Sequence, residues 1–355
     1  MNTLATFASI KDGRIRLALI GCGRIAGKHF DAIEKLSDQL ELVAVCDNKP
    51  ERLAAAVEKT GATGYVCLAD VLSAGVADAV VLATPSGLHV CQVIAAAEAG
   101  CHVISEKLMA TGWKDGRRMV EACDRHGVRL FVVKQNRQNA TLQMVKRAVL
   151  EKHLGHIHMV SINVFWTRPQ GYYDQDAWRG TWEFDGGALM NQASHYVDLI
   201  DWLIGPVESV QAMTGTLARD IEAGDSAVMN IKWRSGTLGT MAVSMLTYPK
   251  NLEGSTTILG ENGSVRVGGV AVNENQHREM AEKCPEDDTI EWVNYETTSV
   301  FGFGHKAYYE NVIATLRGEA EPDTDGREGL LSLELLVAAY LSARGGSMVA
   351  LPLQY

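Results

Sequence analysis

A glycine-rich turn lies near the N-terminus, where the apolar run 17–20 is followed by Gly21, Gly23 and Ala26. Between a strand and a helix, the first glycine of such a turn permits a tight bend, and the second lets phosphate groups approach the backbone. The small third residue lets the helix pack closely on the strand. The free N–H groups at the helix start attract anions. The spacing therefore predicts a dinucleotide site, which also includes Arg24 and Ile25.

An acidic residue follows the second apolar strand at the position where a ribose ligand is expected. This strand, LELVAVCD, ends in Asp47. A carboxylate there accepts hydrogen bonds from the adenosine ribose and repels a 2'-phosphate, so NAD is favoured over NADP. The alternative interpretation of Asp47 is a solvated cap after the strand. The nearby Lys49 and Arg52 weaken the predicted preference for NAD over NADP.

Polar residues also follow three later apolar strands, at 79–83, 102–105 and 130–133. The carboxyl ends of parallel strands meet at one edge of a sheet, where ligands bind. We therefore expect these residues to line the cofactor edge: Thr84, Pro85, Ser86, His89, Glu106, Lys107, Gln135 and Arg137.

Two residues far apart in the sequence are suited to proton chemistry. Lys107 can stabilise an alkoxide, and His195 can accept a hydroxyl proton because imidazole titrates near neutrality. Gly186 and Gly187 precede a predicted helix on which Asn191 and His195 stand four apart, hence on one face. Taken alone, Lys107 also fits an exposed ion pair with Glu106, and His195 also fits a half-buried structural histidine.

The elements that must position these residues change character along the chain. Strands and helices alternate up to residue 138, which predicts a doubly wound parallel sheet over 1–138. From 139 to 355 the pattern is mainly period-two, which predicts an α+β domain with a large open, mainly antiparallel sheet. GENGS is expected to form a hairpin turn, 276–288 a loop, and 329–344 an apolar helix that packs back on the sheet.

Composition restricts the partners. The 355 residues carry a net charge of −10, which argues against nucleic acid or anionic membrane as a partner. The seven cysteines are scattered without CxxC pairs, so we expect reduced thiols and no metal site. No apolar run spans a bilayer, and the first residues lack the pattern of a signal peptide, so we expect a cytoplasmic protein.

Several motifs together resemble the glucose-fructose oxidoreductase, inositol dehydrogenase and MocA family. They are GCGRIAGKH, CD, TPSGLH, EK and GGALMNQASHYVD, and the resemblance runs from about Arg16 to the C-terminus. It implies a Rossmann domain and a second domain whose sheet covers the nicotinamide. It also implies catalytic roles for Lys107 and His195 and cofactor contacts for Trp178 and Arg179. Two departures stand out: Leu108 replaces a proline after the lysine, and Asn191 replaces an aspartate.

One branch of this family resembles the chain more specifically, over VVKQNR, the segment 164–203 and MLTYPKNLEGS. This branch comprises the UDP-N-acetylglucosaminuronate 3-dehydrogenases of lipopolysaccharide O-antigen synthesis, which oxidise the sugar C3 hydroxyl to a ketone with NAD. The resemblance implies a homotetramer and, in some members, cofactor recycling by 2-oxoglutarate. Side chains suited to this UDP-sugar are Lys107, Arg137, Arg168, Tyr172, Asn191, His195, Tyr248 and Asn251.

Two other functions remain open from the residues alone. One is an inositol or other sugar dehydrogenase of the same family, against which Asn191 and the arginine-rich segment count. The other is a non-catalytic NAD-binding sensor, since GxGxxA folds also serve regulation.

Overall fold

The computed structural model describes residues 7, 9–269, 271–281 and 304–354. Its contacts divide the chain into two compact units. The first contains residues 1–134 and 305–330, and the second contains 135–304 and 331–355. The first boundary falls after residue 134, close to the expected boundary at residue 138, and the segment 305–330 belongs to the first unit, which the sequence analysis did not predict.

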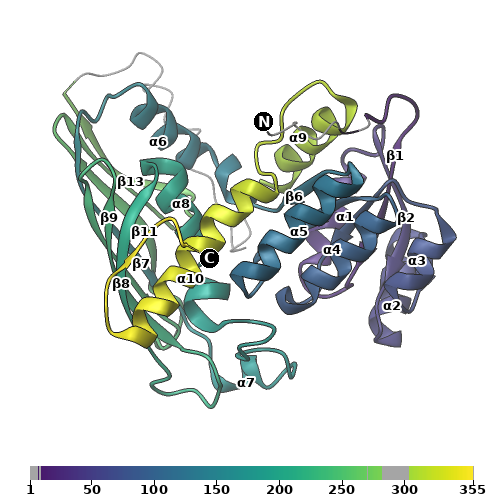
Figure 1. The fold of residues 1–355 in the computed structure, drawn as a ribbon, viewed down its shortest axis with the longest axis horizontal. Coiled ribbons are helices and arrows are strands. Elements are labelled where there is room, and N and C mark those ends of the chain that lie inside the picture. The colour runs from purple at the N-terminus through teal and green to yellow at the C-terminus, as the bar shows by residue number, and fades with distance from the viewer. Residues whose placement is uncertain (1–6, 8, 270, 282–303, 355) are drawn as a thin grey trace. The chain divides into compact units, whose positions relative to one another are not determined.

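The first unit is built on a parallel sheet. Within the described residues the sheet has six strands in the order β3-β2-β1-β4-β5-β6, and the α/β expectation is confirmed. Helices alternate with the strands along the chain (Figure 1). The elements are β1 (Ile15–Ile20), α1 (Ala26–Glu34), β2 (Leu40–Cys46), α2 (Pro50–Thr60), β3 (Thr63–Tyr65), α3 (Leu68–Ala74), β4 (Ala79–Leu82), η1 (Ser86–Leu88), α4 (His89–Glu98), β5 (His102–Ser105), α5 (Trp113–His126), β6 (Leu130–Val132) and α9 (His305–Arg317).

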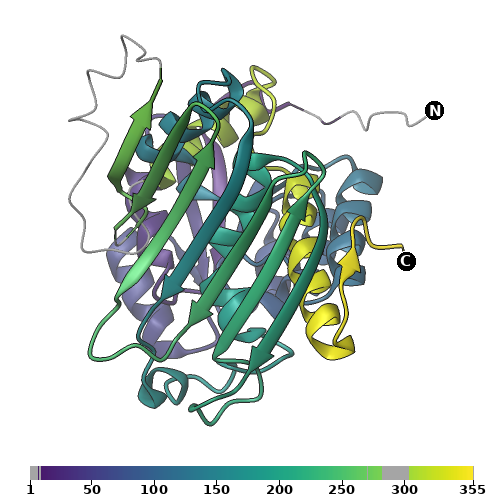
Figure 2. The ribbon, with the colours of Figure 1, turned by 90° about the vertical axis from the view of Figure 1, so that its left-hand side faces the viewer.

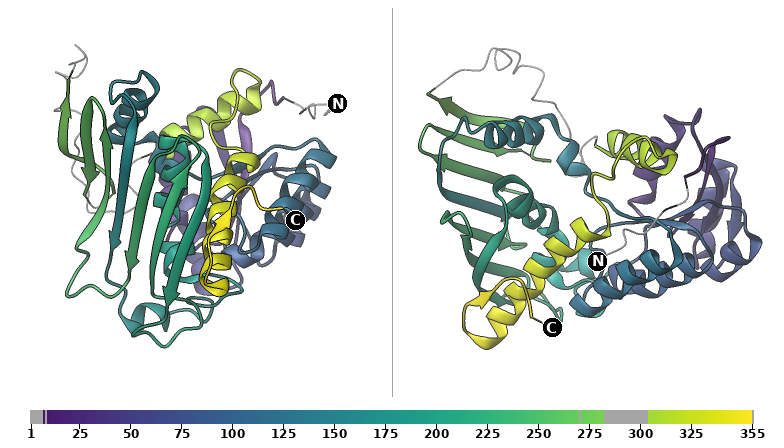
Figure 3. Two further views of the ribbon diagram at one scale, coloured as in Figure 1. Left: turned by 60° about the vertical axis from the view of Figure 1, so that its left-hand side comes forward. Right: turned by 45° about the horizontal axis from the view of Figure 1, so that its top comes forward.

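Helix α9 completes the core of the first unit from the far end of the sequence. Its side chains Tyr308, Tyr309 and Val312 are buried in the same apolar cluster as Leu17 and Phe30. The helix lies beside α1, as the yellow-green and purple segments of Figure 3 show. The Ile10 N–H also donates to the Leu316 carbonyl at 2.8 Å. The nucleotide-binding unit is therefore discontinuous in sequence.

The second unit is a mixed, mainly antiparallel sheet with helices on one face. In the described part of the chain it has eight strands in the order β13-β12-β11-β7-β10-β9-β8-β14. Its elements are η2 (Gln135–Gln138), α6 (Ala140–Leu150), β7 (Ile157–Phe165), α7 (Gln170–Tyr173), η3 (Ala188–Gln192), α8 (Ser194–Ile204), β8 (Val207–Gly215), β9 (Ser226–Trp233), β10 (Leu238–Ser244), β11 (Glu253–Gly260), β12 (Gly263–Gly268), β13 (Glu274–Met280), α10 (Gly326–Gly345, which begins in the first unit) and β14 (Val349–Ala350).

The two faces of this sheet differ. Register places Met159, Leu238 and Leu259 in one row, and Met213 and Val228 in another on the same face. All five are exposed, whereas the alternate residues of the strands are buried. Figure 2 looks onto the uncovered face.

Two local expectations for the second unit have clear outcomes. The hairpin at GENGS is present, because β11 pairs with β12 across it. The loop expected from residue 276 is wrong at its start, since Glu274–Met280 forms strand β13 on β12. Residues 282–288 lie outside the described residues. No helix in the described part of the chain is long and apolar enough to span a bilayer.

Candidate active site

The two glycines of the N-terminal turn, Gly21 and Gly23, are required for different structural reasons. Gly21 has φ +96°, and a Cβ there would lie 2.8 Å from the Ala83 carbonyl carbon, so the approach of β4 requires glycine. At Gly23, no protein atom lies within 4 Å of the position that a Cβ would take. Packing does not demand glycine there, but close approach of a pyrophosphate does. The turn thus fits a dinucleotide.

Asp47 is held in a fixed orientation at the end of β2. Its Oδ2 accepts the Cys22 N–H at 2.8 Å, and its Oδ1 accepts the Lys49 N–H at 2.8 Å. Each carboxylate oxygen keeps a second lone pair for a ribose hydroxyl. The side chain is only 7% exposed, so it is not the solvated cap that was the alternative interpretation.

His89 joins two loops at the cofactor edge. Its Nδ1 lies 2.8 Å from the Leu108 carbonyl and its Nε2 lies 3.0 Å from the Thr84 carbonyl. The ring is fully buried, and this burial lowers the pKa of His89 although the two carbonyls oppose the shift. The ring thus lies between the turn after β4 and the turn after β5, and in its neutral form it donates to one of these two carbonyls. Direct contacts of Thr84, Pro85, Ser86 and His89 with NAD stay predictions.

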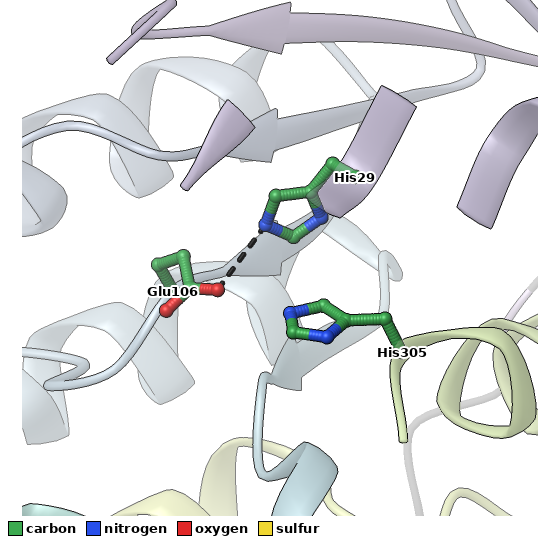
Figure 4. Close-up of side chains that lie close together, drawn as sticks. All are labelled: His29, Glu106 and His305. Atoms are coloured by element: carbon green, nitrogen blue, oxygen red, sulfur yellow. Dashed lines mark hydrogen bonds and ion pairs between the residues drawn. The ribbon is translucent and has the colours of Figure 1, made fainter. Parts of the chain in front are cut away.

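Glu106 and Lys107 follow β5 directly. Glu106 is buried, and its Oε2 accepts the backbone N–H of Lys107 at 3.1 Å. Its Oε1 lies 3.1 Å from His29 Nε2, whose ring stands beside it in Figure 4. Burial raises the pKa of Glu106, but the His29 hydrogen bond and nearby positive charges outweigh it and lower the pKa to about 2. The carboxylate is therefore ionised.

The Lys107 side chain is half-buried, and the next residue, Leu108, has its carbonyl beside the His89 ring. Leu108, which replaces the family proline, is 5% exposed and forms a cis peptide bond with Lys107. Its carbonyl is the partner of His89 described above. The turn at Lys107 is therefore held by side chains on both sides.

Asn191 and His195 do not share one continuous α-helix. Asn191 lies in the π-helical turn η3, and His195 lies in the first turn of α8. The expectation that both stand on one face of a single helix is wrong, because Gly187 at φ +79° leads into a wider turn. The Asn191 amide donates to Asp185 Oδ1, and Asp185 Oδ2 accepts the Gly180 N–H at 2.7 Å. The role of Asp185 in holding Asn191 was not predicted.

Tyr172 lies between two arginines. The guanidinium of Arg179 is 4.3 Å, and that of Arg168 5.2 Å, from the centre of its ring. Gln192, which sequence reasoning missed, accepts from Arg168 Nε at 3.1 Å and donates to the Tyr172 hydroxyl at 3.1 Å. Arg179 Nε also lies 3.7 Å from Asp176 Oδ2, so its charge is partly balanced within the protein, and Arg168 is the guanidinium of this cluster that suits an anionic ligand. Trp178 lies next to this cluster, 4.8 Å from the Arg179 guanidinium.

The remaining predicted substrate residues of the second unit have other surroundings. Arg137 is buried and forms a bidentate ion pair with Asp198, at 2.8 and 2.7 Å. Tyr248 is 94% exposed, and Asn251 Oδ1 accepts the Thr167 N–H at 2.8 Å. Gln135, predicted to contact the cofactor, is 2% exposed, and its Oε1 has no hydrogen-bond partner among the described residues.

A parallel sheet with this glycine turn, and with the Asp47 carboxylate fixed at the position of the ribose, defines an NAD-binding domain. The chain belongs to the Gfo/Idh/MocA oxidoreductase family. The family models match over almost the whole chain: "Oxidoreductase family, NAD-binding Rossmann fold" over residues 15–134, and "Oxidoreductase family, C-terminal alpha/beta domain" over 146–351. The cofactor is NAD.

Several relatives cover nearly the full chain. The WlbA dehydrogenase of Chromobacterium violaceum, solved with NADH and UDP-GlcNAcA, is 63% identical with a TM-score of 0.94 over 99% of both chains. The WlbA dehydrogenase of Bordetella pertussis, solved with the same ligands, is 62% identical with a TM-score of 0.95 over 97% of this chain and 100% of that one. D-apiose dehydrogenase of Paraburkholderia graminis is 30% identical over 98% of this chain and 92% of its own.

Proposed function

We propose that the protein oxidises the C3 hydroxyl of UDP-N-acetylglucosaminuronic acid to the 3-keto sugar with NAD. The observation that carries this proposal is the identity of 62–63%, over 97–99% of the chain, with two dehydrogenases whose structures contain NADH and UDP-GlcNAcA. Identity at that level over both units supports a shared ligand, not only a shared fold.

The reaction removes a proton and a hydride from one carbinol. His195 accepts the proton of the C3 hydroxyl as the C3 hydride leaves and the carbonyl forms. The ammonium group of Lys107 stabilises the alkoxide that develops on the oxygen. Asn191 cannot exchange a proton, so it orients the sugar by hydrogen bonding. Bound NAD supplies the hydride acceptor, and the products are the ketone, NADH and one proton.

Recognition of the anionic substrate is assigned to the second unit. Arg168, beside Tyr172, supplies positive charge for a uronate carboxylate or a pyrophosphate. Asn251 and Tyr248 supply further polar contacts. The 3-keto product carries the carbonyl group that a transaminase requires. The proposal therefore includes a role in the synthesis of an amino sugar for the lipopolysaccharide O-antigen. A cytoplasmic location is part of this proposal.

The proposal extends to the fate of NADH and to assembly. Hydride transfer from NADH to 2-oxoglutarate, with one proton, would give 2-hydroxyglutarate and restore NAD in place. A homotetramer is supported by the exposed apolar residues on the uncovered face of the sheet, such as Met213 at 70% and Leu238 at 53% exposure.

One experiment tests the substrate and the recycling together. Purified protein is mixed with UDP-N-acetylglucosaminuronate, with and without added NAD, and the NADH absorbance is followed before and after addition of 2-oxoglutarate. An NADH band that rises on sugar addition and falls on 2-oxoglutarate addition is expected. Absence of the band, from protein shown to bind NAD, would contradict the proposed substrate.

A free-sugar dehydrogenase is the second candidate, favoured by the 30% identity with D-apiose dehydrogenase. The same assay with D-apiose and inositol separates the two. A free-sugar dehydrogenase oxidises a sugar that carries no UDP group, whereas the proposed enzyme requires a UDP-linked sugar.

A further inference from the structure

A chain of buried hydrogen bonds leads from helix α9 to the backbone of Lys107. The Tyr309 hydroxyl lies 2.8 Å from His29 Nδ1, and His29 Nε2 lies 3.1 Å from Glu106 Oε1. The other Glu106 oxygen accepts the Lys107 N–H at 3.1 Å. Tyr309 and His29 are fully buried, and Glu106 is 6% exposed. All four residues belong to the first unit.

Chemistry fixes the direction of the bond between Glu106 and His29. Glu106 is ionised because its pKa lies at about 2, so it only accepts, and the proton between it and the imidazole belongs to His29 Nε2. The Tyr309 phenol keeps its proton because burial raises the pKa of Tyr309 well above its usual value, so its O–H can donate to His29 Nδ1.

We propose that Tyr309 and His29 are positioning residues that act through Glu106 to hold Lys107 in its reactive place. Lys107 extends from a turn rather than from a helix or strand, so its backbone needs external anchors. Glu106 supplies one through the Lys107 N–H, and its charge also attracts the Lys107 ammonium. This inference rests on the proposed role of Lys107.

His29 and Glu106, together with His305, form a cluster with the composition of a metal site, but the contacts of these residues argue against metal binding. The possible ligand atoms of His29, Glu106 and His305 lie within 4.8 Å of one another. However, both ring nitrogens of His29 and both oxygens of Glu106 already have hydrogen-bond partners. The charges of Lys28 and Lys107 also act on His305 and Glu106, and they oppose a cation.

His305 belongs to this cluster but not to the series of hydrogen bonds from Tyr309 through His29 and Glu106 to Lys107, which we call the relay. Its ring packs edge-on against His29, with centroids 5.5 Å apart, and Figure 4 shows it beside the bonded pair. Neither ring nitrogen has a hydrogen-bond partner among the described residues. Burial and the adjacent His29 lower the pKa of His305 to about 4, although Glu106 opposes the shift.

The test compares matched substitutions in the full-length enzyme with NAD and UDP-N-acetylglucosaminuronate. Tyr309→Phe removes only the relay hydroxyl, and Tyr308→Phe makes the same change at the adjacent buried tyrosine, whose hydroxyl makes no hydrogen bond to His29 or Glu106. His29→Leu breaks the relay, and His29→Gln restores a donor toward Glu106. We expect Tyr309→Phe and His29→Leu to lower kcat by about 10- to 100-fold, as small misplacements of catalytic groups do. KM and NADH affinity should stay near wild type, and His29→Gln should recover part of kcat.

Three results would overturn the proposal: equal kcat for Tyr309→Phe and Tyr308→Phe, a loss that appears only in thermal stability, or a stoichiometric divalent metal that His305→Gln removes. If the wild-type enzyme does not turn over this sugar, the proposed function fails but the relay is still testable. Nitrogen NMR of His29 should then show a proton on Nε2, and Tyr309→Phe should shift the Nδ1 resonance. A ring that carries its proton on Nδ1 and none on Nε2 would contradict the relay.

Discussion

Arg137 and Asp198 form a bidentate ion pair inside the second unit. The two bonds are 2.8 and 2.7 Å long, both side chains are nearly excluded from solvent, and Ser332 Oγ lies 3.4 Å from the same carboxylate. Removing one partner of such a pair leaves a buried charge without compensation. We therefore expect Arg137→Met to lower the free energy of unfolding by about 3–5 kcal/mol in urea titrations. A large rise in KM without loss of stability would instead support the predicted substrate contact.

The two glycines of the turn should respond differently to alanine. Gly23→Ala meets no protein atom, so folding stability should hold while NADH affinity falls at least about tenfold, or 1.4 kcal/mol. Gly21→Ala meets the backbone of Ala83 at a positive φ and should cost about 1–3 kcal/mol of stability. Calorimetric titration and thermal melts separate the two effects. Equal NADH affinity in Gly23→Ala and wild type would argue against pyrophosphate contact at this turn.

His102 should make the first unit sensitive to acid. Burial and the Arg129 charge lower the pKa of His102 to about 4, although Asp78 opposes the shift, and its Nδ1 accepts the Arg129 N–H at 2.9 Å. The unfolded chain binds this proton below about pH 6.5 and the folded chain only near pH 4, so stability falls as pH drops through that window, by roughly 3 kcal/mol. His102→Asn keeps an acceptor without titrating. Its stability should fall less from pH 7 to pH 4 than that of wild type, in urea titrations at each pH.

Substitution of the two proposed catalytic residues should separate chemistry from binding. His195→Ala and Lys107→Met should lower kcat by about 10²- to 10⁴-fold. NADH affinity, measured by fluorescence titration, should stay largely intact because neither change alters the glycine turn or Asp47. Near-normal turnover by either variant would show that the roles are assigned wrongly.

The uncovered face of the second unit should carry the subunit contacts. We expect the double change Met213→Glu and Leu238→Glu to dissociate the proposed tetramer, because charge replaces apolar area at an interface. Sedimentation velocity measures the mass of the assembly. Val66→Glu, a change at an equally exposed residue of the first unit, is the control. If the double variant keeps the wild-type mass, the contacts lie elsewhere.

Local patterns in the sequence were sufficient for most of the fold. The parallel strands, the glycine turn and the Asp47 position all follow from short-range spacing. Strand β13 was missed because ENQHREM is polar at almost every position and pairs only at the sheet edge. The turn at Asn191 was missed because π-helical and α-helical turns share their residue preferences.

The support of the site depends on contacts that spacing does not encode. His29 and Tyr309 are separated by 280 positions, and no pattern around either one indicates the other. Arg137 looked like a ligand residue because an arginine after a strand is chemically suited to anions. Its partner Asp198 lies 61 positions away, so only the folded chain shows the buried ion pair between them.

The return of helix α9 to the first unit affects how the protein is made. Residues 1–134 leave the ribosome well before His305–Arg317 are synthesised, and the second unit is translated in between. Until then the nascent nucleotide-binding layer lacks Tyr308, Tyr309 and Val312, and its apolar cluster stays open to water. The turn at Lys107 likewise gains the support of Tyr309 only after helix α9 has been translated, so stable binding of NAD to the nascent chain should not precede that point.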